Sequence, residues 1–76
     1  EYEAAASHFS RAVEQRQGFA RAQFNLGNTL YRLGSYREAA EAFEAVLSRE
    51  PDNQDAIYNL GLSYISLSES LAGEEE

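Results

Sequence analysis

Residues 24–36 read FNLGNTLYRLGSY, and the triplet Asn25-Leu26-Gly27 within this stretch returns 34 residues later as Asn59-Leu60-Gly61. When the chain is aligned with itself at this offset, ten of the 42 compared positions are identical, and most of them are apolar or small. The residues that recur 34 positions further on are Tyr2, Ala5, Ala6, Phe9, Ala22, Asn25, Leu26, Gly27, Leu33 and Glu41. A period of 20–50 residues is typical of stacked structural repeats. The sequence therefore predicts a repeat architecture, in preference to an ordinary helical bundle with accidental self-similarity.

Two helical patterns alternate along the chain. Pattern B places apolar residues at i, i+3, i+4, i+7, i+10 and i+11, which is one face of an amphipathic helix. It consists of Tyr36, Ala39, Ala40, Phe43, Val46 and Leu47, and earlier of Tyr2, Ala5, Ala6, Phe9, Ala12 and Val13. Pattern A consists of Gln23, Leu26, Leu30 and Leu33, and later of Ile57, Leu60, Tyr64 and Leu67. We expect an all-α chain of four helices in the order B-A-B-A, at about 2–16, 20–33, 36–49 and 53–67, with short loops and antiparallel neighbours.

Turn residues separate these patterns. Gly34-Ser35 is typical of a helix C-terminal cap followed by a short turn. Residues 50–53, Glu-Pro-Asp-Asn, end the next helix, because proline cannot continue it and Asp52 or Asn53 can cap the one that follows. We expect residues 17–19, Gln-Gly-Phe, to make the same kind of turn without a proline.

The motifs of the middle unit are Leu26-Gly27-x-x-Leu30, Ala39-x-x-x-Phe43 and Pro51. They resemble the tetratricopeptide repeat, although Gln23 and Ile57 replace its tryptophan, Leu30 replaces its tyrosine and Gln17 replaces the first proline. The resemblance covers about residues 1–67 and implies one full repeat, 20–53, flanked by half repeats at 1–19 and 54–67. The small residues Gly27, Gly61, Ala5 and Ala39 are expected where two helices approach most closely.

The two ends of the chain depart from the repeat. Ser68 stands where the repeat has glycine, and residues 68–76 are assigned to an irregular acidic C-terminal extension. The alternative is a continuation of the last helix to about Ala72. The first B helix has no A helix before it, so we expect an exposed apolar edge around Tyr2 and Ala5. Because the chain does not begin with methionine, we interpret it as part of a longer protein.

Composition argues against several classes of function. The net charge is −7, with six arginines and no lysine, which disfavours nucleic acid or an anionic membrane surface as the main partner. No apolar run approaches the length of about 18 residues that a transmembrane helix needs. The one histidine, His8, lies off the apolar face, there is no cysteine, and Glu38, Glu41 and Glu44 form a solvated stripe on the helix at 36–49. We expect neither an enzyme nor a cofactor or metal.

Each A helix carries a second face beside its packing residues. On the first A helix this face consists of Arg21, Phe24, Asn25, Asn28, Tyr31 and Arg32, and on the second of Asp55, Tyr58, Asn59, Leu62, Ile65 and Ser66. The resemblance implies that these residues line a concave groove. Such a groove suits an extended peptide, because an asparagine amide both donates to and accepts from a peptide main chain. Asn25 and Asn59 stand at equivalent repeat positions and are expected to stack like rungs.

The other groove residues would select side chains of the peptide. Phe24, Tyr31 and Tyr58 would form pockets, and Arg21 and Arg32 would favour an acidic residue. A structural alternative is that the asparagines satisfy polar groups between helices and that Phe24 and Tyr58 only pack between the A helices.

A clamp for chaperone C-termini is a more specialised form of groove in domains of this kind. Asn28 and Asn59 match its asparagines, but Phe24 and Asp55 stand where it needs basic residues, so the sequence argues against this clamp.

Taken together, these patterns predict a protein-protein interaction module that binds a peptide or protein segment in a groove. The alternative is a scaffold piece that associates end-to-end through its terminal helices, with a second copy or with neighbouring repeats.

Overall fold

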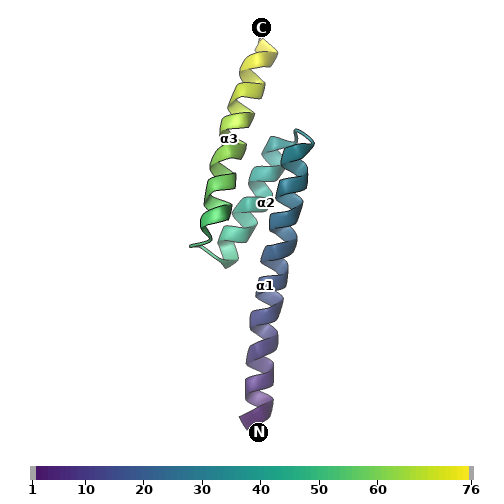
Figure 1. The fold of residues 1–76 in the computed structure, drawn as a ribbon, viewed down its shortest axis with the longest axis vertical. Coiled ribbons are helices and arrows are strands. Elements are labelled where there is room, and N and C mark those ends of the chain that lie inside the picture. Colours follow the sequence, from purple (N-terminus) through teal and green to yellow (C-terminus); the bar gives the residue numbers. More distant parts are fainter. Residues whose placement is uncertain (1, 76) are drawn as a thin grey trace.

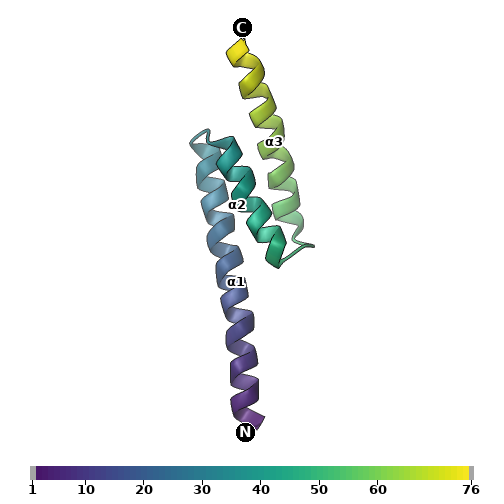
Figure 2. The ribbon, with the colours of Figure 1, turned by 180° about the vertical axis from the view of Figure 1, so that it is seen from behind.

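The computed structural model describes the backbone of residues 2–75 and the side chains of Gln15 and residues 17–73. Within residues 2–75 the chain forms three α-helices and no strand: α1 at Tyr2–Arg32, α2 at Tyr36–Arg49 and α3 at Gln54–Glu75 (Figure 1). Successive helices run antiparallel, and α2 packs against both α1 and α3. The N-terminal half of α1 extends beyond the ends of α2 and α3 (Figures 1 and 2), and the molecule measures 65 × 20 × 13 Å. The all-α prediction is confirmed.

The prediction of four helices is wrong, because the first two patterns form one continuous helix. Residues 17–19, expected to be a turn, lie inside α1. The chain lacks the residues that stop a helix here: Gln17 stands where the next junction has Pro51, and Phe19 stands where it has the capping residue Asn53. Gly18 alone costs a helix only about 1 kcal/mol relative to alanine. Phe19 also contacts α2, since the guanidinium carbon of Arg49 lies 4.5 Å from the centre of its ring.

The other two junctions form as predicted. Gly34 has φ +82°, and the amide of Ser35 donates to the carbonyl of Leu30 at 2.9 Å while that of Gly34 donates to Tyr31 at 3.0 Å. This pair of bonds is a Schellman motif, which needs a residue in the left-handed conformation at the glycine. At the second junction the side-chain oxygen of Asn53 accepts the amide of Ala56 at 3.0 Å and so caps α3.

The irregular extension expected at 68–76 is helical as far as the structure describes it. Helix α3 continues to Glu75, which is also beyond the alternative end at Ala72. Ser68 takes the place that Gly34 holds one repeat earlier, and a serine adopts a positive φ much less readily than glycine. Without that turn the helix propagates.

The core lies on both sides of α2. Ala39, Phe43 and Val46 of α2 are fully buried, as is Ala56 of α3, and Ala20 of α1 is 3% exposed. Phe43 packs against the bare backbone of Gly27, where a Cβ would lie 2.7 Å from the ring. The predicted close approach is thus confirmed at Gly27, and Ala39 is fully buried.

The prediction of a close approach is wrong at Gly61, where an added Cβ would meet nothing within 4 Å. The residue equivalent to Phe43 would be position 77, which lies outside the 76 residues. The expectations for Ala5, for the edge around Tyr2 and for His8 concern side chains outside the described residues.

Candidate functional site

Side chains of the predicted groove face join α1 to α3. Nδ2 of Asn59 donates a hydrogen bond to Oδ1 of Asn28 at 3.1 Å. Further along, about one turn on in α1 and two turns on in α3, the hydroxyls of Tyr31 and Ser66 are 2.8 Å apart and share a hydrogen bond. The repeat spacing therefore brings residues more than 30 positions apart onto one shared face of α1 and α3.

A small cavity of about 100 Å³ lies beside this amide pair. Its lining residues are Asn28, Tyr31, Phe43, Asn59 and Leu62, four of which belong to the predicted face. Phe43 is the lining residue outside the predicted face, and its ring extends from α2 into the space beside the backbone of Gly27. Sequence reasoning assigned Phe43 to the core alone, and the missing Cβ of Gly27 is the signal that could have placed it here.

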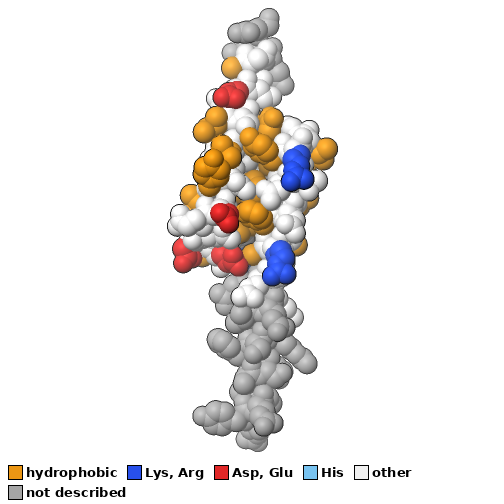
Figure 3. Space-filling view, viewed as in Figure 1, with side chains coloured by type: hydrophobic (Ala, Val, Ile, Leu, Met, Phe, Trp, Pro, Cys, Tyr) orange, Lys and Arg blue, Asp and Glu red, His pale blue; other side chains and the backbone are white. Residues whose placement is uncertain are grey.

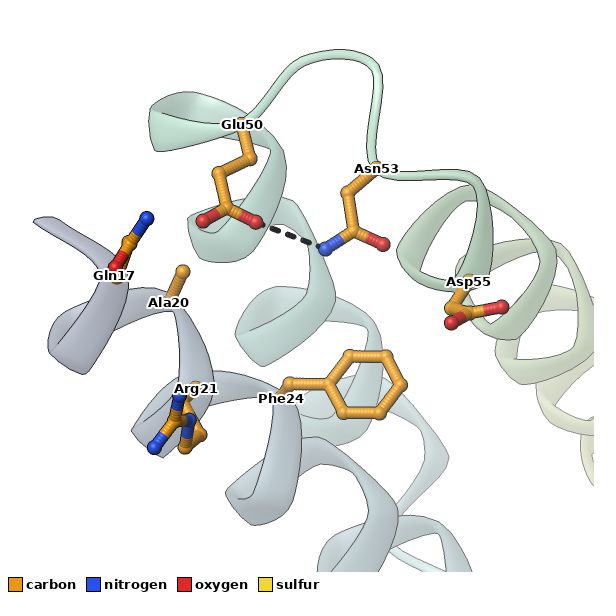
Figure 4. Close-up of a pocket in the computed structure, with 7 residues that line it drawn as sticks. All are labelled: Gln17, Ala20, Arg21, Phe24, Glu50, Asn53 and Asp55. Atoms are coloured by element: carbon orange, nitrogen blue, oxygen red, sulfur yellow. Dashed lines mark hydrogen bonds between the residues drawn. The ribbon is translucent and has the colours of Figure 1, made fainter.

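A larger open pocket of about 410 Å³ lies at the N-terminal end of α3 (Figure 4). It contains three predicted residues, Arg21, Phe24 and Asp55. The other lining residues are Gln17, Ala20, Glu50 and Asn53, which sequence reasoning assigned to turns or to no site. Gln17 lines the pocket because α1 continues through the first junction, so the wrongly predicted turn also hid this residue. Ala20 lies inside the helix predicted at 20–33 but outside its predicted groove face.

The pocket contains charges of both signs. Arg21 faces it from α1, Asp55 from α3 and Glu50 from the end of α2, so carboxylates outnumber the guanidinium (Figure 4). Oε1 of Glu50 accepts a hydrogen bond from Nδ2 of Asn53 at 3.0 Å, which fixes one carboxylate at the rim. The ring of Phe24 extends from α1 toward α3 and packs edge-to-face on Phe43, with ring centres 5.7 Å apart.

The remaining residues of the predicted groove are exposed to solvent. Asn25 and Arg32 are exposed, and Tyr58 is 67% exposed. Asn25 and Asn59 do not form the expected rungs, because the amide of Asn59 bonds to Asn28 instead. The cause is that α3 lies alongside α1 with an offset that brings Asn59 next to the residue one turn beyond Asn25.

One side of the molecule combines apolar area with separated charge. Hydrophobic side chains cover α3 and the upper part of α1, basic side chains lie on α1, and acidic ones lie on α3 and around the α2–α3 loop (Figure 3). In the described part of the chain no helix is both long and apolar enough to cross a membrane. Among the residues whose side chains the structure describes, no three or more metal-ligating side chains gather into a group that could hold a metal ion.

Comparison with known proteins gives one family. The family model described as tetratricopeptide repeat matches residues 1–36 and 24–74, so that the two matches together span nearly the whole chain. Neither curated proteins nor solved structures gave a match.

Proposed function

Because the chain belongs to the tetratricopeptide repeat family, whose members typically mediate protein-protein interactions, we propose that it binds an extended segment of a protein partner along the shared face of α1 and α3. The observation that carries this proposal is the Asn28–Asn59 amide pair, which lies beside a cavity on the face where α1 and α3 meet.

The amide pair suits a peptide main chain. Its hydrogen bond uses one N–H of Asn59 and one lone pair of Asn28. Asn28 keeps its amino group as a donor, and Asn59 keeps its carbonyl oxygen as an acceptor. A donor and an acceptor side by side match the C=O and N–H groups that alternate along an extended chain. This mode of binding is independent of the partner's side chains.

The surroundings of the pair supply the selectivity. Tyr58 and Ile65 are exposed on α3, at 67% and 57%, and offer apolar contact to a partner side chain. In the larger pocket, Glu50 and Asp55 outweigh Arg21, which favours a basic or neutral partner residue there. An acidic partner residue, expected beside both Arg21 and Arg32, is therefore favoured only near Arg32.

The affinity should be moderate. A typical specific interface buries roughly 800 Å² per partner, and two A-type helix faces offer only a short surface for a partner. A longer array that adds further A helices would extend the same surface.

A selection of random displayed peptides tests the proposal. The wild type should enrich a peptide motif, and Tyr58→Ala should lose most of that enrichment because it removes an exposed aromatic contact. Ile57→Ala is the matched control, since Ile57 is also exposed but lies on the side of α3 away from Leu62. If no motif is enriched, or if Tyr58→Ala and Ile57→Ala lose enrichment equally, the peptide does not bind in the groove.

A further inference from the structure

One face of α1 is uncovered where the equivalent face of α3 is covered. The face of α1 consists of Ala22, Leu26, Thr29 and Leu33, which are all exposed, Leu26 by 47% and Leu33 by 73%. The repeat places Ala56, Leu60, Ser63 and Leu67 at the same positions of α3. There Ala56 and Ser63 are fully buried, and Ala56 packs with Val46 of α2.

The repeat also specifies which helix should cover the face of α1. Moving α2 back by 34 residues gives residues 2–15, and these carry the same apolar pattern as α2. In this structure residues 2–15 and the uncovered face belong to the same continuous helix. A straight helix cannot fold back on itself, so residues 2–15 of one chain cannot cover the face of that chain.

We propose that residues 2–15 of a second copy of this chain cover the Ala22/Leu26/Thr29/Leu33 face, and that the exchange is reciprocal. The two α1 helices then lie antiparallel around a two-fold axis, and each contact repeats the contact between α2 and α3. An exchange of identical elements is a low-cost route to a dimer, because the contacts exist already in the sequence. This inference concerns a different face from the proposed peptide groove and does not depend on it.

The register of the dimer follows from the contact between Val46 and Ala56. Shifted by one repeat, this contact pairs Ala12 of one chain with Ala22 of the other. In two identical antiparallel helices, the two-fold axis passes midway between the two contacting positions. For residues 12 and 22 this midpoint is residue 17, so the axis passes next to Gly18. An added Cβ on Gly18 would meet nothing within 4 Å in the single chain, and its absence leaves room for a second helix.

The first junction explains why exchange is favoured over folding back. A turn at residues 17–19 would let residues 2–15 cover the face of their own chain, as in a closed monomer. Gln17 stands where the repeat has Pro51, and Phe19 stands where it has the cap Asn53, so the junction is helical instead. The closed monomer is the competing outcome of the experiment.

Cysteine cross-linking distinguishes the two outcomes, because the chain has no cysteine of its own. The variant with both Ala12→Cys and Ala22→Cys should oxidise to a covalent dimer. In addition, Ala12→Cys chains mixed with ¹⁵N-labelled Ala22→Cys chains should give a mixed dimer that mass spectrometry identifies. Arg21→Cys in place of Ala22→Cys is the control, since Arg21 is also exposed but faces the larger pocket, away from the Ala22/Leu26/Thr29/Leu33 face. An intramolecular bridge in the double variant, or mixed dimers no more abundant than in the control, would overturn the proposal.

The mass in solution gives an independent test. Sedimentation of the 76-residue chain should show a concentration-dependent dimer, and Leu26→Glu should weaken it by about tenfold or more, because it buries an unpaired carboxylate. Asn25→Glu adds the same charge one residue away and should change the dissociation constant by less than about threefold. Gln17→Pro, which breaks α1 at the junction, should shift the population to a helical monomer. A wild type that stays monomeric at every concentration would contradict the exchange.

Discussion

At Gly27, the packing of α1 on α2 depends on a missing side chain. The ring of Phe43 fills the space that a Cβ would occupy and also reaches the small cavity beside the Asn28–Asn59 pair. The same two residues therefore serve the core and the candidate groove. Gly61 stands at the equivalent position of α3, where no ring approaches.

This difference predicts opposite effects of one substitution. Gly27→Ala should lower the free energy of unfolding by about 1–3 kcal/mol, because it forces the buried Phe43 ring to move. In Gly61→Ala the added Cβ meets no atom within 4 Å. This variant should raise the free energy of unfolding by up to about 1 kcal/mol, because alanine has a higher helix propensity than glycine. Urea unfolding of both variants gives the comparison. Equal stability of the two variants would show that Phe43 does not pack on Gly27 in solution.

Tyr64 makes a contact that depends on pH. Its hydroxyl donates a hydrogen bond to Oε1 of Glu44, and this bond, together with desolvation and the Glu44 charge, raises the pKa of Tyr64 above the ordinary value of 10.0. The folded state thus favours the neutral phenol, so the stabilisation is complete below pH 10 and is lost as the pH rises through the raised pKa.

Tyr64→Phe should remove this pH dependence. The stability difference between wild type and variant should be largest near pH 8 and should shrink above pH 10, and it should be small because Tyr64 is 49% exposed. Urea unfolding at pH 8, 10 and 11 measures it. A difference that stays constant over this range would mean that the phenol and Glu44 do not interact.

At the scale of the elements, the junction residues decide where helices end. Where the chain keeps Gly34, Pro51 and Asn53, the turns form with the expected hydrogen bonds. Where it has Gln17, Phe19 or Ser68 at the equivalent positions, the helix continues. Periodicity locates the apolar faces of the helices, but only the capping chemistry determines their ends.

The cap of α3 can be tested directly, because two neighbouring residues were both candidates. Asn53→Ala should lower the free energy of unfolding by about 1 kcal/mol, since its side-chain oxygen accepts the amide of Ala56. Asp52→Ala, at an exposed turn position, should change it by less than about 0.5 kcal/mol. Urea unfolding of the two variants distinguishes them. A larger loss of stability in Asp52→Ala than in Asn53→Ala would show that Asn53 is not the residue that caps α3.

The residues show which parts of the fold and site could be predicted from the sequence. The family, the helix faces and the apposition of α1 with α3 follow from the period of 34, because packing selects those positions. The continuity of α1 does not, since a repeat pattern implies a turn at every junction. The amide pair was also missed, because the offset between two neighbouring A helices depends on how both pack against α2.

At the scale of the whole molecule, the shape is unusually extended. The Cα radius of gyration is 16.3 Å, whereas a compact domain of this length would have about 11 Å. The excess comes from the N-terminal half of α1 and the end of α3, which project in opposite directions (Figure 2).

The shape can be tested without the dimer. The wild-type chain at concentrations below the dissociation constant of the dimer is monomeric, so its own shape can be measured. X-ray scattering extrapolated to zero protein concentration should then give a radius of gyration near 16 Å, because α1 stays straight. A value near 11 Å would mean that the first junction bends in solution and that α1 is two helices.

The groove proposal is tested most directly by mapping a selected peptide onto the protein by nuclear magnetic resonance. Amide signals of Phe24, Asn28, Asn59 and Leu62 should shift on titration, whereas those of Ala22, Leu26 and Leu33 should stay nearly unchanged. Shifts confined to the second group, or to Ile57 and Tyr64, would contradict it, because the partner would then bind an outer helix face and not the face shared by α1 and α3.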